Sequence, residues 1–145
     1  MLKLDEFLPY RLSVVSNRVS ETIARAYRDA FGLSIPEWRV IAVTAESEGL
    51  TQQQVGARTC MDKVTVSRAA IALTRRGLIV RAHGTADRRA RILQLSEKGR
   101  TLYAEVVPRA RELEAKIFGA FSMRELSDLN EILGRIDSAA LDISE

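Results

Sequence analysis

Apolar residues near both ends of the chain recur every three to four positions, which is the spacing of one face of an α-helix. These stripes are Leu8, Leu12, Val15, Val19, Ile23 and Ala26, and then Leu126, Leu129, Leu133, Ile136, Ala140 and Ile143. They predict a helix over about residues 7–31, ending near Gly32, and another over about residues 123–142. Between them, further helices are predicted over about residues 35–47, 52–58, 63–76 and 97–117.

The starts of several predicted helices carry capping residues. The pairs Ser34 and Glu37, Thr51 and Gln54, and Ser122 and Glu125 have the spacing of a capping box. In this motif two side chains accept hydrogen bonds from two backbone N–H groups that the helix leaves without partners. Asp62 and Ser96 are expected to be the N-caps of two more helices.

Hydrophobic alternation changes to a period of two after the helix predicted to end near residue 76. Leu78–His83 is apolar and β-leaning, Gly84–Asp87 has turn residues, and Arg91–Leu95 alternates again. This order predicts an antiparallel β-hairpin that directly follows a pair of helices. The fold class is therefore mainly α with a small β-hairpin wing. We expect a winged helix-turn-helix lobe over residues 33–95, with dimerisation helices in residues 1–32 and 96–145.

The charge of the chain is concentrated in its middle. Residues 51–94 contain nine basic and two acidic side chains, a net charge of +7. The remainder holds 13 basic and 17 acidic side chains, a net charge of −4. A basic module between acidic flanks is the electrostatic pattern of a DNA-facing lobe held by a separate scaffold.

One face of the helix predicted over about residues 63–76 suits a DNA major groove. On a helical wheel, Val66, Ala70 and Leu73 share the core side, and Arg68 lies opposite, where it can bond guanine O6 and N7. Arginines at the hairpin tip suit a narrow minor groove. The residues expected at the DNA are Thr51, Lys63, Val64, Thr65, Ser67, Arg68, Arg75, Asp87, Arg88 and Arg89. The alternatives are an ordinary solvated helix face and a solvated basic hairpin.

Composition and missing motifs argue against other classes of protein. With 46% hydrophobic and 28% charged residues the chain should be globular. It has no apolar run near the ~20 residues of a membrane span and no signal-peptide layout, so we expect a cytoplasmic protein that does not engage a membrane. One cysteine and one histidine predict no disulfide framework, metal or cofactor. Without a nucleophile elbow, a phosphate-binding glycine loop or a histidine–carboxylate cluster, an enzyme is not expected. An architectural DNA binder would need a more basic surface overall.

The spaced motifs together resemble the signature of MarR-type (multiple-antibiotic-resistance-regulator) repressors. They are Asp62–Arg68, Leu73, Gly77–Ile79, Asp87–Arg89 and Leu93–Gly99. The resemblance implies an obligate dimer that binds pseudo-palindromic double-stranded DNA, usually as a repressor, with Arg89 in the minor groove braced by Asp87. Two positions depart from the pattern: Cys60 stands where glycine is frequent, and Gly56 where alanine is frequent. Each departure costs about 1 kcal/mol if Cys60 has a left-handed backbone and Gly56 lies within a helix.

The junction between the first helix and the lobe is predicted to hold a small effector. Residues expected to line it are Pro9, Tyr10, Arg11, Leu12, Ser13, Asn17, Trp38, Arg39 and Ile41. The resemblance implies an aromatic carboxylate, a phenol or a related thioester. Alternatively, these residues simply pack the junction and the repressor is constitutive. A third alternative is a thiol-responsive repressor, in which Cys60 near a helix start and Lys63 has a lowered pKa, although a plain buried thiol is the simpler interpretation.

Overall fold

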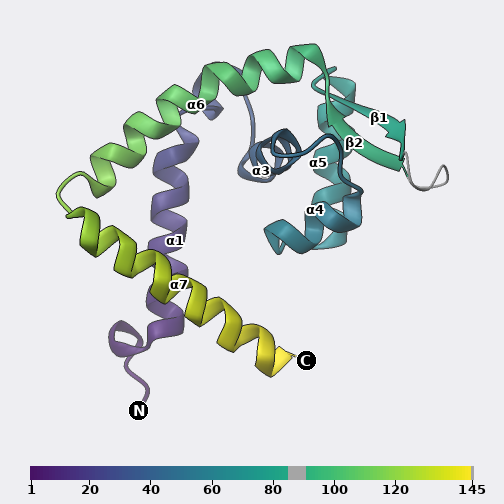
Figure 1. Cartoon of the computed structure of the whole chain (residues 1–145). Helices are drawn as coiled ribbons and strands as arrows, with labels where there is room; N and C mark the ends of the chain where they lie inside the picture. The colour runs from purple at the N-terminus through teal and green to yellow at the C-terminus, as the bar shows by residue number, and fades with distance from the viewer. Residues whose placement is uncertain (85–90, 145) are drawn as a thin grey trace.

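The structure is a computed structural model that describes residues 1–84 and 91–144 (Figure 1). The elements in chain order are η1 (Leu4–Glu6), α1 (Leu8–Ala24), α2 (Arg28–Phe31), α3 (Ile35–Ala45), α4 (Gln52–Thr59), α5 (Lys63–Arg75), β1 (Ile79–His83), β2 (Arg91–Leu95), α6 (Glu97–Phe118) and α7 (Met123–Ser144). The mainly helical fold with a two-stranded hairpin is confirmed.

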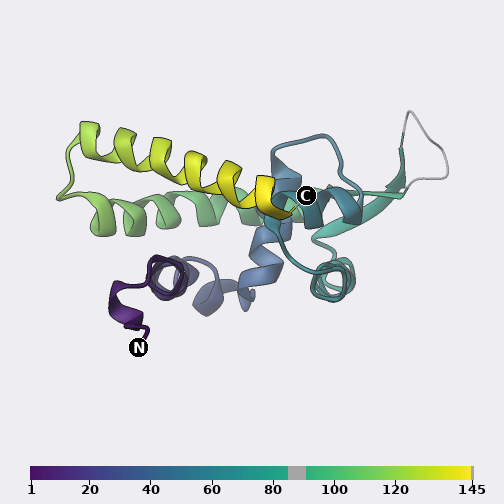
Figure 2. The same cartoon turned by 90° about the horizontal axis from the view of Figure 1, so that it is seen from below.

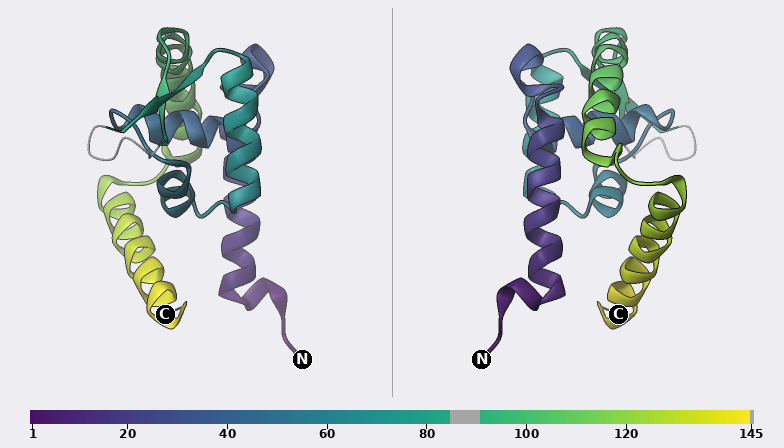
Figure 3. Two further views of the ribbon diagram at one scale, coloured as in Figure 1. Left: turned by 90° about the vertical axis from the view of Figure 1, so that its right-hand side faces the viewer. Right: turned by 90° about the vertical axis from the view of Figure 1, so that its left-hand side faces the viewer.

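A long helix, α6, connects the two halves of the chain. Helices α3, α4 and α5 and the hairpin gather near its N-terminal end (Figure 1). Helices α1 and α7 project away from the lobe as two separate helices on different sides of α6 (Figures 2 and 3). Helix α7 has no buried residue, so it does not pack against its own chain along its length.

The predicted single helix over residues 7–31 is wrong, because α1 ends at Ala24 and α2 begins only at Arg28. The intervening turn is tightened by hydrogen bonds from the Ala26 N–H to the Ile23 carbonyl and from the Tyr27 N–H to the Ala24 carbonyl. Tyr27 is 2% exposed, so the turn directs its ring into the core. Arg28 and Glu21 form an ion pair across the break, with Nη1 and Oε2 2.9 Å apart.

The capping predictions are confirmed. Ser34 and Thr51 each accept a hydrogen bond from the third residue of their helix, in complete capping boxes. Asp62 and Ser96 accept hydrogen bonds from the N–H groups of Thr65 and Gly99. Ser122 and Glu125 exchange the same reciprocal bonds at the start of α7. These caps fix where the helices begin.

The core of the lobe lies between α3, α5, the hairpin and the start of α6. Val66, Ala70 and Leu73 of α5 are all buried, as the helical wheel predicts. In the hairpin, Ile79 pairs with Leu95 and Arg81 with Leu93. Leu50, which precedes α4, exchanges two backbone hydrogen bonds with Leu93 and so joins the hairpin to the helix-turn-helix.

Glycine at position 99 permits a close approach of α6 to the lobe. A Cβ atom there would lie 2.1 Å from the backbone oxygen of Leu78. The same contact is reinforced by hydrogen bonds from Ser96 N–H to the Leu78 carbonyl and from Lys98 Nζ to the Arg76 carbonyl. The first turn of α6 is therefore fixed against the start of β1.

Replacing this glycine tests the contact. We expect Gly99→Ala to lower the free energy of unfolding by about 1–3 kcal/mol, because the added methyl group overpacks a rigid backbone contact. The matched control is Gly56→Ala within α4, where the added Cβ would lie 3.4 Å from the backbone oxygen of Met61, an ordinary van der Waals distance. There, alanine should stabilise the helix by about 1 kcal/mol or less. Denaturant unfolding of both variants without DNA measures the difference, and an undiminished stability of Gly99→Ala would contradict the contact.

Candidate nucleic-acid interface

Helix α5 presents a non-core face to solvent. Its N-cap, Asp62, accepts hydrogen bonds from the Thr65 N–H at 2.8 Å and from the Thr65 hydroxyl at 3.0 Å. On the outer face Val64 is 57% exposed and Arg68 is exposed, whereas Val66 on the inner face is buried. An arginine beside an exposed β-branched residue has the donors and the methyl groups that contact base edges in a major groove.

The other predicted DNA residues on the helix-turn-helix lie around this face. Lys63 and Arg75 are exposed at the two ends of α5, and Ser67 is half-buried on its flank. The Thr51 hydroxyl accepts a hydrogen bond from the Gln54 N–H, so this side chain already caps α4. The Thr65 hydroxyl likewise donates to Asp62, which leaves its oxygen as an acceptor.

The hydrogen bonds from Thr65 also affect the charge of the cap. They lower the pKa of Asp62 below its usual value of 3.8, first through the backbone N–H and then through the hydroxyl. The carboxylate is therefore ionised at neutral pH and lies at the N-terminal end of α5, where a negative charge is favourable.

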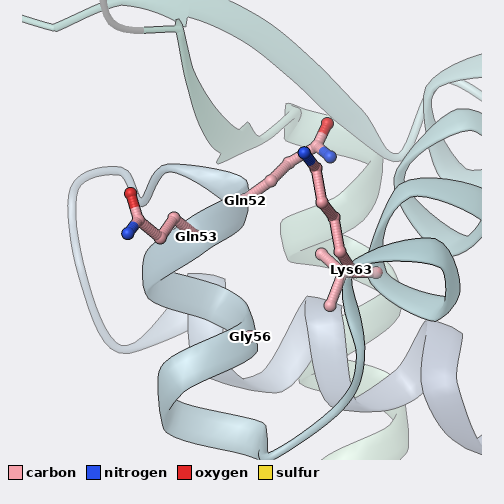
Figure 4. Close-up of a pocket in the computed structure, with 5 residues that line it drawn as sticks. Gln52, Gln53, Gly56 and Lys63 are labelled. Atoms are coloured by element: carbon pink, nitrogen blue, oxygen red, sulfur yellow. The ribbon is translucent and has the colours of Figure 1, made fainter.

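A concavity of about 500 Å³ lies between α4 and α5, and of the expected DNA residues that the structure describes only Lys63 lines it. Its walls are formed by Gln52, Gln53, Gly56, Lys63 and Val66 (Figure 4). At its rim, Arg81 Nη1 of β1 donates a hydrogen bond to Gln52 Oε1 at 2.7 Å. Sequence reasoning did not select Arg81 or Gln52. The feature that could have drawn attention to Arg81 is its place on the inner face of a predicted strand, where it pairs with Leu93.

The predicted effector residues divide into two groups in the structure. Trp38 stacks between Tyr27 and Tyr103, with ring centroids 5.2 and 5.7 Å apart, and Ile41 is fully buried. The predicted effector residues on α1 are all exposed: Pro9, Tyr10, Arg11, Leu12, Ser13 and Asn17. Arg39 Nη2 of α3 donates to Ser20 Oγ of α1 at 3.4 Å. Ser20 follows Ser13 by about 10 Å along the helix axis, so the two groups approach each other only toward the C-terminal end of α1.

The aromatic stack connects three helical segments. Tyr27 belongs to the turn after α1, Trp38 to α3 and Tyr103 to α6. Burial raises the pKa of Tyr27 above its usual value of 10.0, against the opposing charges of Arg28 and Arg39. The Tyr27 hydroxyl therefore stays protonated at neutral pH.

Cys60 forms the turn between α4 and α5. Its φ of 56° and ψ of 23° place it in the left-handed region, so the condition for the cost of about 1 kcal/mol at this non-glycine residue is met. The expectation of a buried thiol is wrong, because Cys60 is exposed. As the C-cap residue of α4 it lies outside the packed side of the helix pair.

Comparison with known proteins points to one family. A family model described as MarR family matches residues 31–90. The HTH-type transcriptional regulator FarR of Neisseria gonorrhoeae is 28% identical over 106 residues, which cover 71% of this chain and 73% of FarR. The crystal structure of a probable transcriptional regulator from Pseudomonas aeruginosa is 27% identical, with a TM-score of 0.80 over 92% of this chain and 99% of that chain. Residues 31–90 therefore match the MarR family, and the chain is similar to MarR-type regulators.

A further likeness concerns the fold. CouR from Rhodococcus jostii RHA1, solved bound to p-coumaroyl-CoA, has a TM-score of 0.83 and 24% identity over 94% of this chain and 95% of CouR. Members of the MarR family are DNA-binding regulators and not enzymes. The comparisons therefore support a MarR-type transcriptional regulator. Within residues 1–84 and 91–144, no helix has the length and apolar character needed to cross a membrane.

The predicted contacts at the tip of the wing, Asp87, Arg88 and Arg89, lie outside the described residues. The strands that lead to the tip are described, and they pair in register from Ile79 with Leu95 to His83 with Arg91. These three residues stay predictions.

The Asp62 cap predicts a pH-dependent stability. Because its pKa is lowered by folding, its contribution is fully present above the usual value of 3.8 and is lost as the pH falls through the lower folded-state value. Asp62→Ala should lower the melting temperature at pH 7, and the gap from wild type should narrow below about pH 4. Asp62→Asn keeps an accepting oxygen and is the matched control, with a smaller loss. A gap that stays constant from pH 7 to 2.5 would contradict the charged cap.

Proposed function

We propose that this MarR-type regulator is a homodimer that binds a pseudo-palindromic operator and represses transcription. The observation that carries the proposal is the exposed face of α5, with Arg68 and Val64 presented by a lobe whose segment 51–94 has a net charge of +7. In this proposal residues 33–95 form the DNA-binding lobe, and residues 1–32 and 96–145 form the dimerisation helices.

The dimer is supported by apolar side chains that one chain leaves uncovered. Leu8, Leu12 and Val15 of α1 are 42–67% exposed, and Leu133 and Ile136 of α7 are more than 40% exposed. Both helices carry apolar residues at helical spacing, and they lie apart from each other in Figure 3. A second copy of the chain would cover these faces, and two-fold symmetry would place the two α5 helices on successive major grooves.

We further propose that the operator is released by a small aromatic acid or a related thioester. Support comes from the exposed guanidinium of Arg39 near the aromatic stack of Trp38, and from the fold shared with CouR, which binds p-coumaroyl-CoA. Because Ile41 is buried, the ligand would contact the edge of Trp38 and the exposed side chains of α1. Arg11 or Arg39 would pair with its anionic group.

The function is tested by measuring binding to an operator selected from the DNA around the gene. Sedimentation should show a dimer at micromolar concentration, and one dimer should occupy one duplex. Arg68→Ala should weaken operator binding by about 1–3 kcal/mol if this residue bonds a guanine, with relaxed preference at that base pair. Arg111→Ala, an exposed arginine of α6, is the matched control. A monomer in solution, or an Arg68→Ala variant that binds like wild type, would contradict the proposal.

The effector is tested with a panel of aromatic carboxylic acids, phenols and aromatic CoA thioesters. An effector that prefers the DNA-free form 100-fold supplies about 2.7 kcal/mol for release. We expect at least one compound to weaken operator binding and to change Trp38 fluorescence, and Arg39→Met to reduce the response to acids. If no compound acts at millimolar concentration, the protein is a constitutive regulator. If only oxidants act, and Cys60→Ser abolishes the effect, it is a thiol-responsive regulator.

A further inference from the structure

Arg81 occupies an unusual place in the wing. It pairs directly with Leu93, which is fully buried, and residues directly opposite in an antiparallel pair project to the same face. Ile79 and Leu95, on that same face, are also buried. Arg81 is therefore a charged residue on the core-facing side of the strand, at the point where the core ends, and its side chain is exposed.

The guanidinium of Arg81 is held over α4. Its Nη1 donates to Oε1 of Gln52, the first residue of that helix, at 2.7 Å. A guanidinium has five N–H donors in a rigid planar fork, which is more than this one bond uses. The bond therefore fixes the orientation of the fork without exhausting its capacity to bind an oxyanion.

A second cation approaches the same amide from α5. Lys63 and Gln52 both line the concavity between α4 and α5. Figure 4 shows the Lys63 side chain extending from the start of α5 toward the Gln52 side chain. Asp62, one of the two acids in residues 51–94, is bonded to Thr65 as the cap of α5. The other, Asp87, lies outside the described residues.

The location of this pair of cations matches the path of a DNA strand. If α5 enters a major groove and the wing reaches the adjacent minor groove, one sugar-phosphate strand separates these two grooves. That strand must pass between the start of α5 and the base of the wing, where Gln52 accepts a hydrogen bond from Arg81 and shares a concavity with Lys63. Phosphate oxygens are the acceptors that an arginine fork and a lysine ammonium bind most readily.

We propose that Arg81 and Lys63 together bind one backbone phosphate of the operator, with Gln52 as the positioning residue of Arg81. This inference rests on the proposed DNA-binding function. It adds a DNA contact located between those of the helix-turn-helix and those of the wing tip. This contact depends on the groove geometry and not on base sequence. Arg81 and Gln52 thereby join the DNA-contacting surface of α5.

The salt dependence of binding tests the phosphate contact. Arg81→Ala should weaken binding to operator and to unrelated DNA alike, by roughly tenfold, as expected for a lost hydrogen bond to a charged group. The slope of log affinity against log salt should become shallower by up to about 0.9, the value for one phosphate, because Lys63 still neutralises part of that phosphate's charge. Arg81→Lys should keep the slope but not the full affinity, because it keeps the charge and loses the fork. Arg111→Ala is again the control.

Gln52→Met separates positioning from contact. Methionine keeps the length of the side chain but removes the acceptor, so affinity should fall less than in Arg81→Ala and the salt slope should stay nearly unchanged. In an Arg81→Ala background, Gln52→Met should have little further effect, since the residue it positions is gone. An equal loss in both backgrounds would overturn the positioning role.

Neutralising single phosphates locates the contact directly. Duplexes with one methylphosphonate at each position in turn should reveal a position in each half-site where neutralisation weakens wild type more than it weakens Arg81→Ala, which keeps Lys63. If wild type binds its operator and no such position exists, or if Arg81→Ala keeps the wild-type slope, this inference is wrong while the proposed function stands. If wild type binds no DNA, the proposed function itself fails. Should Arg81→Ala unfold, Arg81→Lys and the methylphosphonate scan on wild type still decide.

Discussion

The arrangement of this protein depends on the approach of one helix turn to one peptide group. The N-terminal turn of α6 lies so close to the carbonyl of Leu78 that position 99 has no room for a Cβ atom. Around this contact, Ser96 Oγ donates to the Gly77 carbonyl, and Arg76 Nη2 donates to the Phe31 carbonyl. These bonds tie the end of α5, the start of β1 and the end of α2 to the helix that leads away from the lobe.

This junction explains how the small helix-turn-helix lobe is coupled to long helices. If only side chains met at this junction, they could repack and let α6 shift along the lobe. The contact between the two backbones instead fixes the position and direction of α6. The aromatic stack of Tyr27, Trp38 and Tyr103 provides a second connection, between the turn after α1, α3 and α6. A change in the angle between α1 and α6 would therefore reach α5 through two routes, one made of hydrogen bonds and one of stacked rings.

Helix caps and other contacts between residues close in sequence were predictable from the sequence. Features that depend on contacts between distant parts of the chain were less predictable. The caps at Ser34, Thr51 and Asp62 were found because the partners lie within one helical turn. The break after Ala24 was missed, because residues 25–27 have no glycine or proline and the turn is stabilised by burial of Tyr27. Arg81 was passed over for a related reason: its partner Gln52 is 29 residues away, and no periodicity relates a strand residue to the start of an earlier helix. The exposure of Cys60 followed from the direction of a left-handed turn, which composition does not encode.

The exposed thiol at the turn before α5 also provides a natural site for a label from which distances can be measured. Cys60 is the only cysteine of the chain, so a nitroxide or a fluorescent dye attached to it labels one defined position per subunit. In a two-fold dimer the two labels would sit beside the two recognition helices, and the distance between them would report the spacing of those helices in solution. The residue that departs from the glycine frequent in this family thus makes the geometry of the dimer accessible to spectroscopy without any engineered cysteine.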